Sequence, residues 1–305
     1  MTRRRALVTG GAGFLGSHLV DRLVADGWRV QVVDDLSTGR ADRLPRDVRL
    51  DSADIATDDI TGVFQAGRPN VVFHLAAQAS VPRSVADPAR DRAVNVGGSV
   101  RVLAAARGAG AGRFVFVSSG GAIYGETHRA ATERAKVEPI SPYGRHKLEA
   151  ERLVADSGLP FAIARPSNIY GARQSVGLEG AVVAAFVAQA LARAPLTIDG
   201  DGAQTRDFIH AADVVDAVVR LAAPAVPDGT WNVSAGQRTS VSELASLVER
   251  ETGAKLGRSH RPARAGDVHD SAISSTKLRR LGWQPGVALR DGIRELLRDG
   301  LGEAH

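Results

Sequence analysis

Three glycines at three-residue intervals, set between a strand-like run and a helix-like run, constrain the fold of this chain most strongly. Gly10, Gly13 and Gly16 follow a short apolar, β-branched run and precede apolar residues at helical spacing that continue to Val24. A second strand-like run ends at Asp34. A turn without side chains lets an anion approach the helix N-terminus, where free N–H groups favour negative charge. The pattern predicts a βαβ unit that binds the phosphates of a dinucleotide.

The alternation of strand-like and helix-like segments continues along the first half of the chain. Strand-like runs lie at residues 5–9, 28–33, 71–75, 113–117 and 161–164, and helix-like segments such as 100–107 and 143–155 separate them. The runs are apolar on both faces, which is typical of a parallel sheet that helices cover on both sides. We therefore expect an α/β fold, with a Rossmann-like doubly wound parallel sheet and a smaller C-terminal α/β substrate lobe.

The pattern loosens after Pro166. We expect two strands around a tight loop at residues 196–198 and 206–210, and amphipathic helices at 241–252 and 289–298. The interpretation is a nucleotide-binding domain over residues 1–165 and a smaller lobe over residues 166–305, with an interleaved border.

Composition narrows the function classes. The 305 residues include 44% hydrophobic and 24% charged residues, a globular balance, and no cysteine, which excludes disulfides and thiolate chemistry. The net charge of +5 comes mostly from arginine, but no polybasic run exceeds Arg3–Arg5 and no aromatic residues interleave with the basic ones, so we expect no nucleic-acid partner. Neither a signal peptide nor a run of about 18 apolar residues is present, so we expect no membrane association and a cytoplasmic location.

Asp34 supports a dinucleotide at the glycine turn. It lies 24 residues after Gly10, at the end of the second strand, where its carboxylate can accept hydrogen bonds from an adenosine ribose. Its charge would repel a 2′-phosphate, which favours NAD over NADP. Asp54 and Ile55 follow the next expected strand and are candidate contacts of the adenine.

Tyr143 and Lys147 are the candidate catalytic pair. They lie four residues apart at the start of a predicted helix, and therefore on the same face. A phenol is a weak base at neutral pH, and a neighbouring ammonium group favours its ionised form. The chain has only three tyrosines and four lysines, so this spacing is unlikely to arise by chance.

With these residues, the chain resembles the extended short-chain dehydrogenase/reductase superfamily, and most closely its nucleotide-sugar epimerases of the UDP-glucose 4-epimerase type. The resemblance extends over nearly the whole chain. It rests on the order and spacing of six motifs, namely TGGAGFLG at 9–16, HLAA at 74–77, SSGGAIYG at 118–125, YGRHK at 143–147, RPSNIYG at 165–171 and QTRDFIH at 204–210.

The resemblance implies a reaction. Tyr143 would take the proton of the sugar C4 hydroxyl while C4 transfers hydride to NAD, and Lys147 would hold the nicotinamide ribose. The resulting 4-keto sugar would turn over and recover the hydride on its other face. The resemblance also implies a homodimer and no metal ion.

The expected site residues follow from the glycine turn, the catalytic pair and the family motifs. The cofactor contacts are Gly10, Gly13, Phe14, Leu15, Gly16, Asp34, Asp35, Asp54, Ile55, Leu75, Ala76, Ala77, Asn95, Tyr143, Lys147 and Pro166. The UDP-sugar contacts are Asn168, Arg206, Arg264 and Asp267.

One departure concerns the hydroxyl that relatives place between the tyrosine and the C4 oxygen. Gly120 occupies that position, so Ser119, Ser118 or a water would have to replace it. Gly121 and Ala122 stand where related 4,6-dehydratases carry an acid/base pair, which leaves C4 oxidation and its reversal as the simplest chemistry.

Alternatives stay open on the sequence alone. The sugar can be glucose or galactose, an N-acetyl form, since Ser271 replaces a bulky tyrosine of some relatives, or glucuronate, for which Arg173 or its loop could hold the carboxylate. A nucleotide-sugar dehydratase is the alternative enzyme. A non-catalytic NAD-binding module with a basic nucleic-acid-binding surface is the alternative of another class.

Overall fold

The computed structural model describes residues 3–176, 181–263 and 268–301. The chain divides into two compact units, each made of separate segments. Unit 1 comprises Met1–Ser119, Ser141–Arg165 and Val215–Trp231, and unit 2 comprises Gly120–Ile140, Pro166–Val214 and Asn232–His305.

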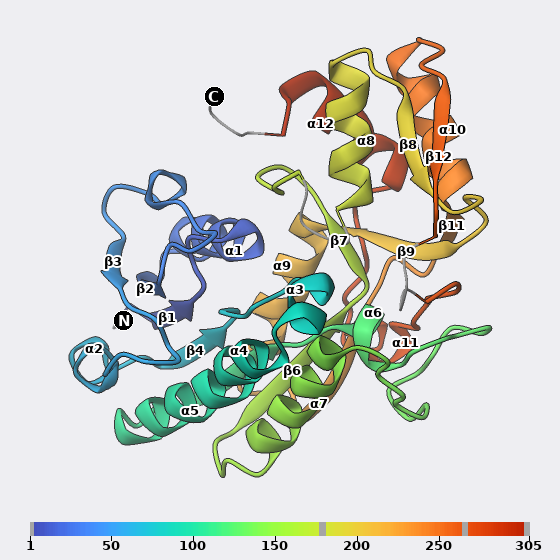
Figure 1. Ribbon diagram of the computed structural model, residues 1–305. Helices are drawn as coiled ribbons and strands as arrows, with labels where there is room; N and C mark the ends of the chain where they lie inside the picture. The colour runs from blue at the N-terminus through green and yellow to red at the C-terminus, as the bar shows by residue number, and fades with distance from the viewer. Residues whose placement is uncertain (1–2, 177–180, 264–267, 302–305) are drawn as a thin grey trace. The chain divides into compact units, whose positions relative to one another are not determined.

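Unit 1 is built on a seven-stranded sheet with the strand order β10-β6-β5-β4-β1-β2-β3 (Figure 1). From β3 to β6, neighbouring strands in this order pair parallel. The strands are β1 (Arg5–Thr9), β2 (Arg29–Asp34), β3 (Arg49–Ser52), β4 (Val71–His74), β5 (Arg113–Val117), β6 (Phe161–Pro166) and β10 (Gly229–Val233). The strand order reverses between β1 and β4, and ligands of doubly wound sheets bind outside the carboxyl ends of strands at such a reversal. The predicted Rossmann-like sheet is confirmed.

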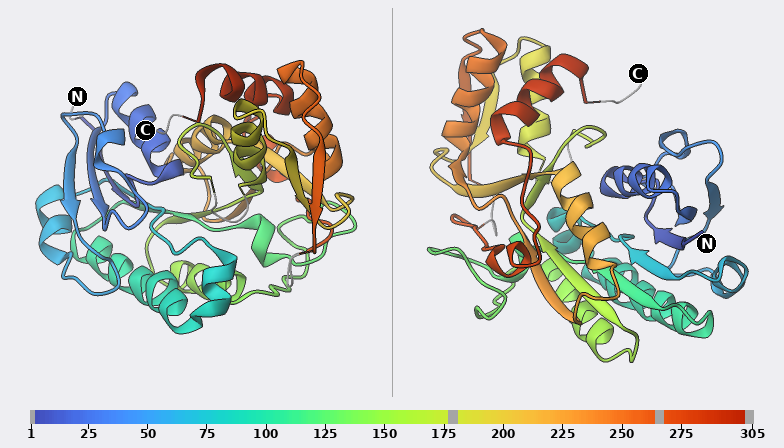
Figure 2. Two further views of the ribbon diagram at one scale, coloured as in Figure 1. Left: turned by 45° about the horizontal axis from the view of Figure 1, so that its top comes forward. Right: turned by 180° about the vertical axis from the view of Figure 1, so that it is seen from behind.

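Helices cover both faces of this sheet. Figures 1 and 2 show α2 (Thr61–Gly67), α5 (Ser99–Gly108) and α7 (Pro142–Ala155) along one face and α1 (Phe14–Ala25) on the other. The first face buries a continuous core in which Leu7, Val72, Phe114 and Ile163 of the strands pack with Phe64, Val102 and Val154 of the helices. Three short segments precede α5, namely α3 (Val81–Ala86), α4 (Pro88–Arg92) and a π-helical turn at Ala93–Gly98.

Unit 2 holds a three-stranded sheet in the order β11-β9-β7 and a two-stranded sheet, β12-β8. Its strands are β7 (Asn168–Tyr170), β8 (Leu196–Asp199), β9 (Thr205–His210), β11 (Arg238–Ser240) and β12 (Arg258–Arg261). Its helices are α6 (Gly120–Ile123), α8 (Val182–Leu191), α10 (Val241–Thr252), α11 (Thr276–Arg279) and α12 (Leu289–Asp299), and α9 (Ala211–Leu221) continues from unit 2 into unit 1. Phe186, Leu244 and Leu296 join α8, α10 and α12 in one apolar core.

The two helices expected in the second half are confirmed, and so are the two strands, but the strands do not pair with each other. β8 pairs parallel with β12, whereas β9 pairs with β7 and β11. The tight turn at Gly200 and Gly202 suggested a hairpin, yet each strand finds its partner elsewhere in unit 2. Local turn chemistry therefore predicted the bend correctly and the pairing wrongly.

Candidate active site

The glycine turn connects β1 to α1 and leaves room for a ligand on one side. Gly10 has a φ of +70°, and a Cβ there would lie 2.6 Å from the backbone nitrogen of Ala76. A Cβ at Gly16 would lie 2.0 Å from the carbonyl oxygen of Gly10. By contrast, a Cβ at Gly13 would meet only that same oxygen, at 3.3 Å. Gly10 and Gly16 therefore permit close packing, while Gly13 keeps the approach to the α1 N-terminus open, as a pyrophosphate requires.

Asp34 ends β2 and is held against this turn. One carboxylate oxygen accepts a hydrogen bond from the backbone N–H of Ala12 and the other from that of Leu36, each at 2.9 Å. Burial raises the pKa of Asp34, and these two hydrogen bonds oppose the rise. Each carboxylate oxygen retains a second lone pair, so Asp34 can still accept from ribose hydroxyl groups. The residues present therefore fit the adenosine end of NAD.

The remaining predicted cofactor residues differ in what holds them. Leu75 and Ala76 follow β4. They lie beside the glycine turn, where the Leu75 N–H donates to Thr9 O at 3.0 Å and the backbone of both residues packs against Gly10. Asp35 and Asp54 each accept a backbone N–H from two residues further along the chain and so stabilise local turns. The others are placed by secondary structure: Phe14 and Leu15 open α1, Ala77 follows β4, Pro166 ends β6, and Ile55 and Asn95 are buried.

Tyr143 and Lys147 lie one turn apart on α7, and both are buried. The helix starts at this position because Pro142 occupies its first turn and the Ser141 hydroxyl accepts from the Gly144 N–H. Lys147 Nζ donates to the carbonyl oxygen of Val117 at 2.7 Å, at the end of β5. Burial lowers the pKa of Lys147 to about 8, although neighbouring carboxylates oppose the shift.

The phenol of Tyr143 is protonated at neutral pH in the chain by itself. Burial raises its pKa to about 12, and a hydrogen bond from Ser119 acts in the opposite direction. In the chain by itself, desolvation of the phenolate outweighs the stabilising contact. The expectation that Lys147 and bound NAD favour the ionised phenol stays a prediction. Ionisation of Tyr143 needs further positive charge in the site.

The structure separates the two serines that could replace the hydroxyl missing at Gly120. The Ser119 side chain lies close enough to the Tyr143 phenol to lower its pKa. Within the described part of the chain, the Ser118 hydroxyl is buried and makes no hydrogen bond. Ser119 is thus the hydroxyl placed at the phenol, a distinction that the sequence left open because both serines follow β5 directly.

The predicted substrate residues of unit 2 that the structure describes are Asn168 and Arg206. Arg206 is buried and donates to the carbonyl oxygens of Thr205 and His269, at 2.8 and 3.0 Å. Asn168 lies on β7, and among the described residues its buried side-chain oxygen has no hydrogen-bond partner. Arg264 and Asp267 lie outside the described residues.

Sequence reasoning missed two buried carboxylates near the Tyr143–Lys147 pair. Glu151 forms a two-pronged ion pair with Arg165, with Nε–Oε1 and Nη2–Oε2 distances of 2.9 and 2.5 Å. Asp91 is fully buried and bonds to a histidine of α7. Neither contact has a local sequence signal, because each joins residues that lie far apart along the chain.

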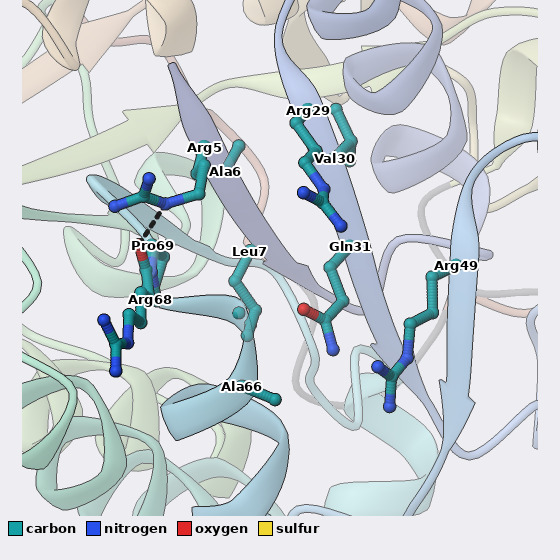
Figure 3. Close-up of a pocket in the computed structure, with 11 residues that line it drawn as sticks. Arg5, Ala6, Leu7, Arg29, Val30, Gln31, Arg49, Ala66, Arg68 and Pro69 are labelled. Atoms are coloured by element: carbon teal, nitrogen blue, oxygen red, sulfur yellow. Dashed lines mark hydrogen bonds between the residues drawn. The ribbon is translucent and has the colours of Figure 1, made fainter. Parts of the chain in front are cut away.

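The pocket in Figure 3 lies at the amino-terminal ends of strands in the unit 1 sheet, away from the carboxyl ends that the glycine turn follows. It has a volume of about 250 Å³, and Arg5, Arg29 and Arg49, which begin β1, β2 and β3, line it. The glycine turn follows the carboxyl end of β1, so this pocket is separate from the predicted cofactor site. Arg5 is engaged with the backbone, since its Nε donates to Arg68 O at 2.6 Å.

One surface cluster has the donor atoms of a metal site. Ligand atoms of Glu126, His128 and Asp270 lie within 4.8 Å of one another in unit 2. The carboxylate of Asp270 already accepts from the Thr205 hydroxyl at 2.6 Å, and Glu126 accepts from the N–H groups of His269 and Asp270. These contacts give the cluster a structural role in joining two loops, and the expectation of a reaction without metal stays a prediction.

In the described residues, no helix has both the length and the apolar character needed to cross a bilayer.

Similarity to known proteins extends over the whole fold. The chain is 45% identical over 302 residues to a UDP-glucose 4-epimerase of Mycolicibacterium smegmatis, which covers 95% of this chain and 96% of that protein. The crystal structure of a UDP-glucose 4-epimerase of Thermotoga maritima with UDP-glucose is 38% identical and superposes with a TM-score of 0.93, covering 97% of this chain and 99% of that one. A UDP-glucose 4-epimerase of Thermus thermophilus in complex with NAD is 37% identical, with a TM-score of 0.92 and coverage of 99% and 100%.

A family model agrees with these similarities. The model of the NAD dependent epimerase/dehydratase family matches residues 6–234, which include the glycine turn, Ser119, Tyr143 and Lys147. Together with the Rossmann-like strand order, these matches show that the chain belongs to the NAD dependent epimerase/dehydratase family.

Proposed function

We propose that this protein is an NAD-dependent UDP-sugar 4-epimerase. The observation that carries the proposal is the arrangement of buried Tyr143 and Lys147 with partly buried Ser119 at the carboxyl end of β5. The glycine turn and Asp34 lie in the same unit, at the strand ends where the sheet order reverses. The similarity to UDP-glucose 4-epimerases over 95% or more of the chain supports this activity and the cofactor.

The residues of the chain divide the chemistry among them. When bound, NAD would supply the acceptor for the hydride of the sugar C4 and the donor for its return to the other face of the 4-keto sugar. Tyr143 takes the proton of the C4 hydroxyl and later gives it back, so no net oxidation occurs. Ser119 acts on the phenol and lowers its pKa, and the ammonium group of Lys147 is held by its hydrogen bond to Val117 O. Tyr143 becomes ionised only when added positive charge offsets its desolvation.

The substrate is a UDP-sugar of the glucose and galactose type, and N-acetyl forms and UDP-glucuronate fall within the proposal. Arg206 and Arg264 are suited to the diphosphate, since guanidinium groups match phosphate oxygens, and Asn168 and Asp267 are the other proposed contacts. Ser271 is buried, and its side chain is smaller than the tyrosine of some relatives. We assign cofactor binding mainly to residues 1–165 and substrate binding mainly to residues 166–305. The proposal also includes a cytoplasmic location and a homodimer.

A substrate panel followed by NMR tests this function. The purified protein with NAD is offered UDP-glucose, UDP-galactose, their N-acetyl forms and UDP-glucuronate. We expect conversion at C4 of at least one sugar without a change in mass. Tyr143→Phe should lose most turnover and still bind NAD. The matched control is Tyr124→Phe, which removes a hydroxyl that bonds to Asn232, and this variant should retain its turnover. No C4 conversion of any sugar would refute the proposal, and a loss of water from the product would indicate a dehydratase.

A further inference from the structure

A buried carboxylate from α4 lies against the catalytic helix α7. The side chain of Asp91 is fully buried, and its Oδ1 accepts from Gln78 Nε2 at 2.7 Å and from Asn95 Nδ2 at 3.0 Å. Its Oδ2 lies 2.5 Å from Nδ1 of His146 on α7. Because a carboxylate only accepts, Nδ1 of His146 carries the hydrogen of this bond. The side chain of His146 is itself 14% exposed.

The charge of Asp91 acts on both members of the catalytic pair. It raises the pKa of Tyr143, because a nearby negative charge disfavours the phenolate. It also raises the pKa of Lys147, because it favours the ammonium group. Through its direct effect on Tyr143, a bare carboxylate at this position would oppose the ionisation that the proposed reaction needs. The hydrogen bond from His146 is directed at the oxygen that carries this charge.

Few other charges act on the network. On α7, Glu151 acts on Lys147 and is paired with Arg165, and Glu149 is exposed and paired with Arg92 of α4. The other segments packed against α7 and Asp91 contribute neutral groups. Ser84 of α3 accepts from the Tyr143 N–H at 3.1 Å, and Asn95 donates to Asp91. Buried His74 of β4 is neutral, because burial lowers its pKa to about 3. Arg83 of α3 is exposed.

We propose that His146 is a positioning residue for proton transfer at Tyr143: its Nδ1–H fixes the Asp91 carboxylate beside the catalytic pair and offsets its charge. This inference rests on the proposed function, since it assigns Tyr143 as the group that exchanges the proton. It makes His146, which lies between Tyr143 and Lys147 in the chain, a determinant of the pH dependence of this protein.

Three variants test the inference on the full-length protein with NAD. His146→Leu removes the donor to Oδ2 of Asp91 and leaves the hydrogen bonds that Gln78 and Asn95 donate to Oδ1. His146→Asn supplies an amide N–H in place of Nδ1–H. His146→Leu combined with Asp91→Asn removes the donor and the charge together, while the new amide oxygen can still accept from Gln78 and Asn95. Thermal unfolding and NAD affinity are measured for each variant.

We expect the acid limb of the kcat/KM profile of His146→Leu to move up by about one pH unit, with activity at neutral pH lowered about tenfold. His146→Asn should stay within about threefold of the unsubstituted protein. The double variant should bring the acid limb back to its original position or below it. A purely structural role would instead leave the limb in place and make the double variant worse than His146→Leu. Either of those two outcomes would overturn the inference.

A spectroscopic measurement keeps this test separate from the proposed function. Phenolate absorbs in the near ultraviolet, and the difference between each protein and its Tyr143→Phe counterpart, both with NAD bound, reports the titration of Tyr143 alone. We expect the titration midpoint to rise in His146→Leu and to fall back in the double variant. If no UDP-sugar is converted, the proposed function fails, and the phenolate titration still decides the role of His146. Identical midpoints of the Tyr143 titration in all of these proteins would refute the inference even if the enzyme is active.

Discussion

The side chain of Ser119, just after the end of β5, interacts with the phenol of Tyr143 on the catalytic helix α7. This contact lowers the pKa of the phenol against the opposing effect of burial. It places a hydroxyl at the proton-exchanging group although Gly120 occupies the usual position of that hydroxyl.

Replacing Ser119 by alanine should slow the enzyme and change its pH profile. Without the hydrogen bond, the pKa of Tyr143 rises, so the acid limb of kcat/KM should move to higher pH, and kcat at neutral pH should fall about 10- to 100-fold. Ser118→Ala is the control, because that hydroxyl makes no hydrogen bond among the described residues. A larger loss in Ser118→Ala than in Ser119→Ala would contradict the assignment.

Two alanine substitutions in the glycine turn should have different effects. At Gly13 the added methyl group meets only the Gly10 carbonyl oxygen at 3.3 Å, so Gly13→Ala should fold and lose NAD affinity by about tenfold or more because the approach to α1 is filled. At Gly16 the methyl group would lie 2.0 Å from the same backbone oxygen, and the free energy of unfolding should fall by about 3 kcal/mol. Urea unfolding and calorimetric titration with NAD distinguish the two. Equal stability of both variants would show that the turn adapts.

Lys147 should make the stability of the NAD-free protein rise with pH. Its pKa is lowered from 10.5 to about 8 in the folded chain, so between these values the unfolded chain binds more protons. The free energy of unfolding therefore increases across this window, and it is flat below it as far as Lys147 is concerned. The check is denaturant unfolding of the protein and of Lys147→Met from pH 8 to pH 10, where the curve of the variant should lack this rise. The range stops there because Tyr143, with a pKa raised from 10.0 to about 12, acts with the opposite sign above it.

Glu151→Gln should destabilise unit 1 strongly. The Arg165–Glu151 pair is almost fully buried, and breaking such a pair by removing its carboxylate costs about 3–5 kcal/mol. Glu149→Gln, on the same helix, breaks an exposed pair with Arg92 and should cost less than about 1 kcal/mol. Chemical denaturation of both variants gives the comparison, and similar values for the two would argue against a stabilising role of the buried pair.

Much of the architecture follows from local patterns in the sequence. β1 and α10 occupy the residues that periodicity predicts, and α10 begins with a capping box of Ser240 and Glu243 and ends at Gly253 in the left-handed conformation. The glycine turn was also predictable, since only residues without a Cβ fit two of its positions. These features depend on neighbouring residues along the chain, so local sequence patterns predict them.

Other features depend on contacts between residues that are distant along the chain, and no local sequence pattern predicts them. The separate pairing of β8 and β9 depends on β12, β7 and β11, none of which the sequence analysis identified. The raised pKa of Tyr143 depends on how deeply α7 is buried, and the distinction between Ser118 and Ser119 depends on the direction in which the chain leaves β5. The Asp91–His146 bond joins residues 55 positions apart.

The last strand of the large sheet, β10, comes from residues 229–233, whereas its neighbour β6 is complete at Pro166. During synthesis on the ribosome, more than sixty residues must therefore emerge before the free backbone edge of β6 acquires its partner. An exposed parallel edge of this kind can pair with other chains, so a prematurely terminated product that ends before Gly229 should be prone to aggregation.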